Sequence, residues 1–460
     1  MSWSSRLVRP AVDVCAAVRP LLVAVLLIGA GVPSVGLAAA EEEIDRSESR
    51  PVPHYPRLLI DPPRLAAEGI RQIAGRRLTV LTDLGPHPEL ETYPAVFEQA
   101  FEQWCAFFRV PAERYADWHL NACLMKEKER FARAGLWPAF LPDFPNGYSC
   151  NYDFWLFDQP SDYYRRHLLL HEGTHSFMNT ILGACGPRWY MEGVAELLAT
   201  HRWQEGRLTM NYLPARREET PFWGRIRIIQ DAVAERQARR LSAVVDVGPQ
   251  AHNTADYAWC WAAALLLDRH PAYHERFRRL SDFVTAADFN DRFHQMWSAD
   301  WQELCEQWQV MVVDMHYGQD IVRTAIDFAP GRPIAASGAE VSVAADRGWQ
   351  NSGLVLQAGR TYRLRAQGRY QVADRPQVWW CEPGGVTIRY HQGRPLGLLL
   401  AAVRPDAPPA DSSSALLRPS VVGLGAELSV ETTGTLFLKI NESPAELADN
   451  AGSCSVVIEP

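Results

Sequence analysis

Residues 171–175 read His-Glu-Gly-Thr-His, and this pentapeptide constrains the fold more than any other part of the chain. On a helix, positions i and i+4 lie one above the other, so His171 and His175 can offer two imidazoles to one metal ion. Glu172 lies beside them, where it can accept a proton from a water at the metal. The pattern therefore predicts a helix that carries a zinc site with a general base next to it.

The residues on either side of the pentapeptide favour a buried helix. Residues 163–170 read as its start, with Ser161 or Asp162 as the N-cap. Downstream, Gly183 is a natural stop. Gly173 in mid-helix costs about 1 kcal/mol relative to alanine, which points to a close approach by another backbone or by a substrate.

A catalytic zinc site usually has three protein ligands, so the third must come from another segment. Glu192 follows His175 at the distance needed for a helix end, a turn and the start of a returning helix that runs to about residue 201. Glu196, four residues on, shares a face with Glu192 and can accept the free N–H of a ligating histidine. The alternative is that both carboxylates belong to a solvated helix face. His167 lies about 12 Å along the axis from His175 and is expected to pack against the site or support it.

With these residues the chain resembles the gluzincin metallopeptidases, the group of thermolysin and the M1 aminopeptidases. The resemblance spans about residues 57–320 and rests on His171, Glu172, His175, the run Trp189-Tyr190-Met191-Glu192-Gly193 with Glu196 behind it, and the run from Tyr257 to Leu265. It implies that His171, His175 and Glu192 bind zinc and that Glu172 is the base. It also implies that Tyr257 stabilises an oxyanion, whereas the residues alone allow a core aromatic there.

Two features depart from that group. The gap between His175 and Glu192 is slightly shorter than is usual, and the Gly-x-Met-Glu-Asn segment that binds the substrate amino terminus in M1 aminopeptidases is absent. The resemblance therefore implies a hydrolytic site and leaves endo- or exo-cleavage open. Residues 154–157 are interpreted as a core strand, with an edge strand that pairs with extended substrate as the alternative.

The first 40 residues read as a signal peptide. They combine three arginines, an unbroken apolar run at 21–28 and the sequence Ala38-Ala39-Ala40 before an acidic stretch. An uncleaved membrane anchor is the alternative. We therefore expect an exported protein (periplasmic, cell-surface or secreted), with residues 41–56 as a linker and membrane contact only if the segment stays uncleaved.

Charge and cysteine content narrow the function classes. The formal net charge of −8 argues against general nucleic-acid binding. Nine cysteines occur, and Cys15 lies in the signal segment, which leaves eight. An even number permits disulfides in an exported protein, although scattered cysteines are commonly buried thiols.

The hydrophobic pattern changes character near residue 340. Residues 57–320 predict an α+β domain of the zinc-metallopeptidase type, with a small sheet and a helical lobe, and residues 321–340 read as a linker. Residues 341–460 show short runs of period two, typical of an all-β sandwich of the jelly-roll type. In the first domain we expect strands at 77–81 and 118–124, helices at 94–108, 126–134, 222–240, 255–268, 272–283 and 299–314, and a loop at 136–152.

The β-rich segment resembles the calcium-dependent, galactose-binding lectin domain of the PA-I type. The matching runs are 348–353, 358–359, 434–442 and 449–453. The resemblance implies that Glu442, Asp449 and Asn450 bind Ca²⁺, whose preferred ligands are oxygen atoms, and that a glycan is a partner. The alternative is a sandwich that has lost both calcium and sugar.

Together these patterns predict an exported zinc-dependent metallopeptidase that hydrolyses a peptide or protein substrate with Glu172 as general base. One alternative is a catalytically inactive peptidase-fold scaffold that binds a glycan or a surface. A third reading is a zinc hydrolase that acts on a non-peptide amide.

Overall fold

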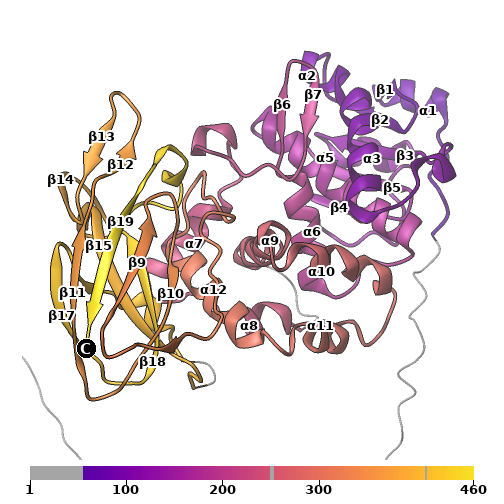
Figure 1. The fold of residues 1–460 in the computed structure, drawn as a ribbon. Coiled ribbons are helices and arrows are strands. Elements are labelled where there is room, and N and C mark those ends of the chain that lie inside the picture. The colour runs from indigo at the N-terminus through magenta and orange to yellow at the C-terminus, as the bar shows by residue number, and fades with distance from the viewer. Residues whose placement is uncertain (1–54, 249–252, 410–411) are drawn as a thin grey trace, which may run out of the picture. The chain divides into compact units, whose positions relative to one another are not determined.

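The computed structural model describes residues 55–248, 253–409 and 412–460 (Figure 1). The expected signal peptide (1–40) and all but the last two residues of the expected linker (41–56) lie outside these ranges. Within them, no helix has both the length and the apolar character needed to cross a membrane. The chain is mixed α+β, with a strand-rich C-terminal region.

A five-stranded mixed sheet forms the N-terminal part, with the strand order β1-β2-β3-β5-β4. Its members are β1 (Arg71–Ala74), β2 (Leu78–Thr82), β3 (Leu120–Met125), β4 (Gly147–Cys150) and β5 (Asp153–Phe157). The three central strands are parallel, and β1 and β4 are antiparallel edges. Residues 154–157 therefore form a core strand, as interpreted, and the edge-strand alternative is wrong. The sequence predicted a loop over residues 136–152, and this prediction is wrong near its end, where residues 147–150 form the edge strand β4.

Helices cover both faces of this sheet because successive side chains of β2 and β3 point to opposite sides. Leu78, Val80 and Ala122 pack with α3 (Tyr93–Phe108) and α5 (Asp162–Phe177). Leu81 and Cys123 pack on the other face, with α1 (Pro62–Ala67) and α4 (Lys128–Arg133). A sheet covered in this way holds α5 against β4 and β5.

The ends of α5 follow from its sequence. Ser161 is the N-cap, and its hydroxyl accepts a hydrogen bond from the Tyr164 backbone N–H at 3.1 Å. At the other end, a π-helical turn (Met178–Leu182) leads into Gly183, whose φ of 88° lies in the left-handed region that glycine adopts without strain. The chain can then turn back into α6 (Arg188–Ala199).

Gly173 allows α5 to pack closely on α3. A Cβ atom at this position would lie 2.8 Å from Phe97 Cε2 and 2.9 Å from Trp104 Cη2. The close approach expected from the sequence is therefore made by aromatic side chains, and not by a backbone or a substrate.

We predict that Gly173→Ala lowers the free energy of unfolding by about 1–3 kcal/mol, because overpacking outweighs the better helix propensity of alanine. Denaturant unfolding measures the change. Gly85→Ala is the control, since a Cβ there would meet no atom within 4 Å. Equal stability of the two variants would contradict the packing argument.

The helical lobe is built around α9 (Thr254–Arg269), in which every residue from Ala258 to Asp268 is buried. Gly193 of α6 lies directly over this helix, and a Cβ there would approach the Cys260 carbonyl oxygen to 2.6 Å. The other elements of the lobe are α7 (Arg225–Ala234), α8 (Leu241–Val245), α10 (His274–Arg278), α11 (Phe289–Trp297), α12 (Trp301–Val313) and the hairpin β6 (Arg202–Gln204) with β7 (Arg207–Thr209). The sequence analysis did not anticipate α8, α11 or this hairpin.

The strand-rich region contains two main sheets that share a core, drawn in orange and yellow in Figure 1. One has the order β14-β15-β18-β10-β8, with β16 also paired to β15, and the other has the order β17-β11-β19-β9. Their bounds are β8 (Arg332–Pro333), β9 (Ala339–Ala344), β10 (Gln350–Leu356), β11 (Thr361–Gln367), β14 (Gly384–His391), β15 (Arg394–Pro405), β16 (Ser420–Val421), β17 (Gly425–Ser429), β18 (Gly434–Ile440) and β19 (Ser453–Glu459). A short hairpin, β12 (Tyr370–Ala373) with β13 (Trp379–Cys381), completes the region.

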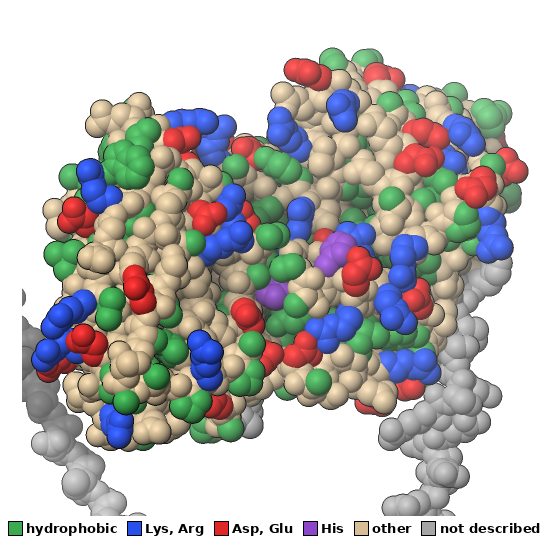
Figure 2. All heavy atoms as spheres, viewed as in Figure 1, with side chains coloured by type: hydrophobic (Ala, Val, Ile, Leu, Met, Phe, Trp, Pro, Cys, Tyr) green, Lys and Arg blue, Asp and Glu red, His purple; other side chains and the backbone are tan. Residues whose placement is uncertain are grey.

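On the face drawn in Figure 2, basic and acidic side chains are interspersed over both the helical and the strand-rich elements. Seven of the eight cysteines from Cys105 to Cys454, all except the half-buried Cys305, are buried free thiols in the described part of the chain.

Candidate metal centre

α5 and α6 bring the three expected metal ligands together. His171 Nε2 lies 3.1 Å from His175 Nε2, and Glu192 Oε2 lies 3.3 Å from the former and 3.4 Å from the latter. All three side chains are buried. The i, i+4 spacing on α5 supplies the two imidazoles, and the turn after Gly183 returns the chain so that Glu192 faces them.

The three atoms fit a zinc ion. Bonds of about 2.0–2.1 Å in a tetrahedral site place any two ligand atoms about 3.3–3.4 Å apart, close to the separations found here. Glu192 Oε2 is buried, and it has no hydrogen-bond partner among the residues that the structure describes. A buried carboxylate oxygen without a partner is costly, and a cation between it and the two imidazoles removes that cost.

Glu172 lies beside this group on the same helix. Burial raises the pKa of its carboxyl to about 7, against the effects of nearby His175 and of a hydrogen bond from the Ser149 side chain. A carboxyl with a pKa near 7 is suited to accept and return a proton at neutral pH. Ser149 belongs to β4, and so does Gly147, where a Cβ would lie 2.6 Å from Glu172 Oε1. The edge strand therefore positions the expected base.

Behind the site, Glu196 lies in a second layer of polar contacts. His171 Nδ1 is 3.5 Å from Glu196 Oε1, and His167 Nε2 is 3.4 Å from Glu196 Oε2. The Arg225 guanidinium donates to both carboxylate oxygens, at 2.9 and 3.0 Å. Burial alone would raise the pKa of Glu196, but Arg225 and His167 hold the pKa well below its usual range. The charged Glu196 can thus orient the His171 ring.

Tyr257 lies in the first turn of α9, with its ring centroid 6.0 Å from that of His171. The Arg225 guanidinium carbon lies 5.8 Å from the centroid of the same tyrosine ring. Burial raises the pKa of the Tyr257 phenol, with further increases from Glu192 and Glu172. The hydroxyl therefore stays protonated at neutral pH and can donate a hydrogen bond.

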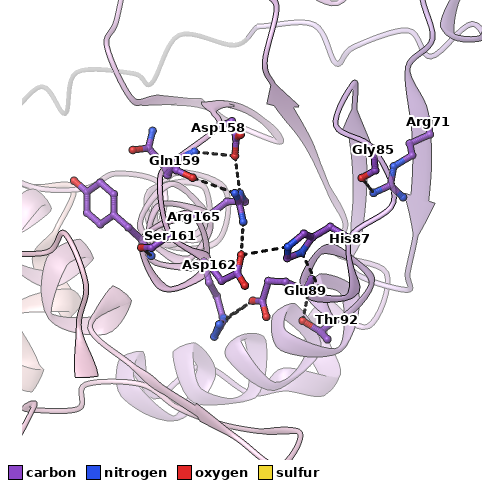
Figure 3. Close-up of polar contacts among 12 residues, drawn as sticks. Arg71, Gly85, His87, Glu89, Thr92, Asp158, Gln159, Ser161, Asp162 and Arg165 are labelled. Carbon is purple, nitrogen blue, oxygen red and sulfur yellow. Dashed lines mark hydrogen bonds and ion pairs between the residues drawn. The ribbon is translucent and has the colours of Figure 1, made fainter. Parts of the chain in front are cut away.

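The start of α5 is fixed by a network on the N-terminal side of the site. Figure 3 shows Arg165 between Asp158, which precedes the helix, and Asp162, its first residue. Arg165 Nε donates to Asp158 Oδ1 and Nη1 donates to Asp162 Oδ1, each at 2.7 Å, and Nη2 donates to the Gln159 carbonyl at 3.0 Å. His87 Nε2 lies 3.9 Å from Asp162 Oδ1. These contacts tie the helix to the end of β5 and to the segment before α3.

Three functional contacts were not anticipated from the sequence. They are made by Arg225, Ser149 and Gly147. None of these residues belongs to a sequence motif, and each contacts the site from an element other than α5 and α6. The turn residues around Gly147 were the only available signal, and they predicted a loop.

The expected calcium ligands lie in the segment between β18 and β19. Glu442, Asp449 and Asn450 each have one buried side-chain oxygen without a hydrogen-bond partner in the described residues. The Asn450 amide nitrogen donates to the Ala345 carbonyl at 3.0 Å, so only the oxygen of this side chain is left without a partner there. Asp449 lies near enough to Glu442 to raise the pKa of its carboxyl.

We predict that Glu442 makes stability depend on pH in metal-free buffer. Burial raises its pKa from 4.5 to about 8, so the folded state binds a proton that the unfolded state has released. The free energy of unfolding should therefore fall by on the order of 2–4 kcal/mol between about pH 4.5 and 8. Chemical denaturation at several pH values tests this. Glu442→Gln should flatten this part of the profile, and an unchanged slope in that variant would assign the effect to other groups.

Comparison with known proteins gives a structural neighbour but no family. No family model matches it, and no curated protein sequence matches it. Among solved structures, the chain is similar to one described as "EclA N-terminal domain; PllA-like lectin", with 22% identity over 26% of this chain and 93% of that one. The TM-score is 0.20.

Proposed function

We propose that the chain is an exported zinc-dependent metallopeptidase with a gluzincin-type domain over about residues 57–320 and a jelly-roll-like accessory domain over about 341–460. The observation that carries the proposal is the convergence of His171 Nε2, His175 Nε2 and Glu192 Oε2 at 3.1–3.4 Å beside Glu172. When bound there, zinc supplies a Lewis acid and an activated water.

In this proposal the side chains of the site divide the chemistry among them. Glu172 accepts the proton of the attacking water and passes it to the leaving amine, a role that its raised pKa permits. The Tyr257 hydroxyl donates a hydrogen bond to the oxyanion that develops on the carbonyl oxygen. Glu196, held by Arg225, keeps the His171 ring oriented.

The edge of the sheet gives this site a means of holding a substrate. Among the described residues β4 is an edge strand that pairs with β5 alone, so its outer edge could pair with an extended peptide. The same strand contains Ser149 and Gly147, which contact Glu172 or lie against it. Substrate bound along β4 would therefore lie beside the base, which favours a peptide over a smaller amide.

For the accessory domain, we propose calcium binding by Glu442, Asp449 and Asn450, with a glycan as the ligand class. Their three buried oxygens without hydrogen-bond partners in the described chain support this assignment.

The proposal as a whole is tested by measuring zinc content together with proteolysis. Elemental analysis of purified protein should show about one zinc ion fewer per chain in His175→Ala than in the wild type. The wild type should cleave an unfolded protein mixture, and the variant should not. Equal zinc content would refute the site. Zinc binding without cleavage of any substrate in the panel would favour the scaffold alternative.

A further inference from the structure

A second group of metal-ligating side chains lies outside the proposed active site. Asp314 directly follows α12, His316 lies two residues further on, and His391 is the last residue of β14. One ligand atom from each of the three residues lies within 4.8 Å of the other two. The group joins the end of the helical lobe to the strand-rich region.

The distances in this group resemble those of a coordination shell. His391 Nε2 lies 3.1 Å from Asp314 Oδ1, and His316 Nε2 lies 3.4 Å from the same oxygen. Two ligand atoms of a tetrahedral zinc site are separated by about 3.3–3.4 Å. Both imidazoles therefore present Nε2 to one carboxylate oxygen at separations close to those of such a shell, and ligand atoms of all three residues lie within 4.8 Å of one another.

The surroundings of Asp314 leave one of its oxygens for a cation. Asp314 Oδ1 is buried, and among the described residues the groups that face it are the two imidazole nitrogens. His391 Nε2 lies 3.1 Å from both carboxylate oxygens, and Lys439 Nζ lies 3.7 Å from Oδ2. The lysine balances the carboxylate through Oδ2, but it does not explain why a second histidine converges on Oδ1.

We propose that Asp314, His316 and His391 bind a divalent transition-metal ion, with Zn²⁺ as the representative case. Two imidazoles and one carboxylate suit zinc and its neighbours, whereas calcium and magnesium prefer an all-oxygen shell. The His316 side chain is 42% exposed, so the ion would keep a coordination position open to solvent. The metal would link the turn after α12 to the end of β14, and it would stabilise the folded state by an amount that grows with the logarithm of the zinc concentration relative to Kd.

The test counts zinc per chain in wild type, His391→Ala and His316→Ala, after equilibration with zinc alone and removal of free metal. His175→Ala provides the background in which the proposed catalytic site is disabled. His294→Ala is the matched control, because His294 Nε2 also pairs with an aspartate, Asp246, at 2.9 Å, and is similarly exposed. Since His316 is partly exposed, its substitution tests the site even where His391→Ala lowers stability.

The expected result is a loss of about one zinc ion per chain in His391→Ala and in His316→Ala, in both backgrounds, with no loss in His294→Ala. Zinc should also raise the melting temperature of His175→Ala but not of the His175→Ala/His391→Ala double variant. Unchanged zinc content in both cluster variants overturns the inference. Zinc lost in the cluster variants but not in His175→Ala supports this site and refutes the proposed active site, so the two failures are distinguishable.

Discussion

Glu172→Gln should reduce the rate of peptide hydrolysis by about 10²–10⁴-fold while zinc content stays at the wild-type level. Glutamine has nearly the same shape and can still accept a hydrogen bond from Ser149, but it cannot take a proton from water. Glu172 is not one of the three atoms that converge at 3.1–3.4 Å, so the metal site should persist. The measurements are kcat/KM on a peptide substrate and zinc per chain.

Two control variants separate loss of the base from other causes of lost activity. Glu102→Gln makes the same chemical change on the exposed face of α3 and should leave both readouts unchanged. His175→Ala should lose zinc and activity together, which separates loss of the metal from loss of the base. If Glu172→Gln kept activity within about threefold of the wild type, the base would have to be another group.

The proposed ligand set could be read from the sequence because its geometry is mostly local. The positions of His171 and His175 on one helical face follow from helix geometry, and α6 returns after a short turn. Glu192 and Glu196 are one turn apart on that returning helix, so a helix that brings Glu192 to the two histidines also brings Glu196 to the same side.

Contacts that depend on distant segments could not be read in the same way. β4 is a four-residue strand with asparagine on either side, so local preferences favour a turn, and only pairing with β5 makes it a strand. Arg225 reaches Glu196 from α7 across a long sequence interval that has no motif. Gly173 shows the same limit, since the sequence indicates a close approach there but does not name Phe97 and Trp104.

The buried pair of Arg225 and Glu196 should be the most sensitive point for stability near the site. Both side chains are almost fully buried, and two hydrogen bonds of 2.9 and 3.0 Å join them. Arg225→Met leaves the Glu196 carboxylate buried with only His167 and His171 near it. Removing one partner of such a pair costs about 3–5 kcal/mol, because the remaining charge has lost its compensation.

The pH dependence of this loss has a definite sign. Burial is the largest effect on the Glu196 carboxyl, and with Arg225 removed only His167 among its main partners still opposes it. We therefore expect the pKa of Glu196 to rise in the variant, so that the folded variant takes up a proton that the unfolded chain has released. The stability difference between wild type and Arg225→Met should therefore widen as the pH rises through the neutral range. Chemical denaturation at pH 5 and pH 8, in metal-free buffer, measures it.

A neighbouring ion pair on the same helix supplies the control. Arg227 Nε lies 2.9 Å from Asp231 Oδ2, but these side chains are 62% and 50% exposed, so Arg227→Met should cost less than about 1 kcal/mol. Adding Glu196→Gln to Arg225→Met should recover part of the lost stability, since the uncompensated charge is then gone. If Arg225→Met and Arg227→Met lowered the free energy of unfolding equally, Glu196 would have to be solvated in the folded protein. That result would also contradict the proposed role of Glu196 in orienting His171.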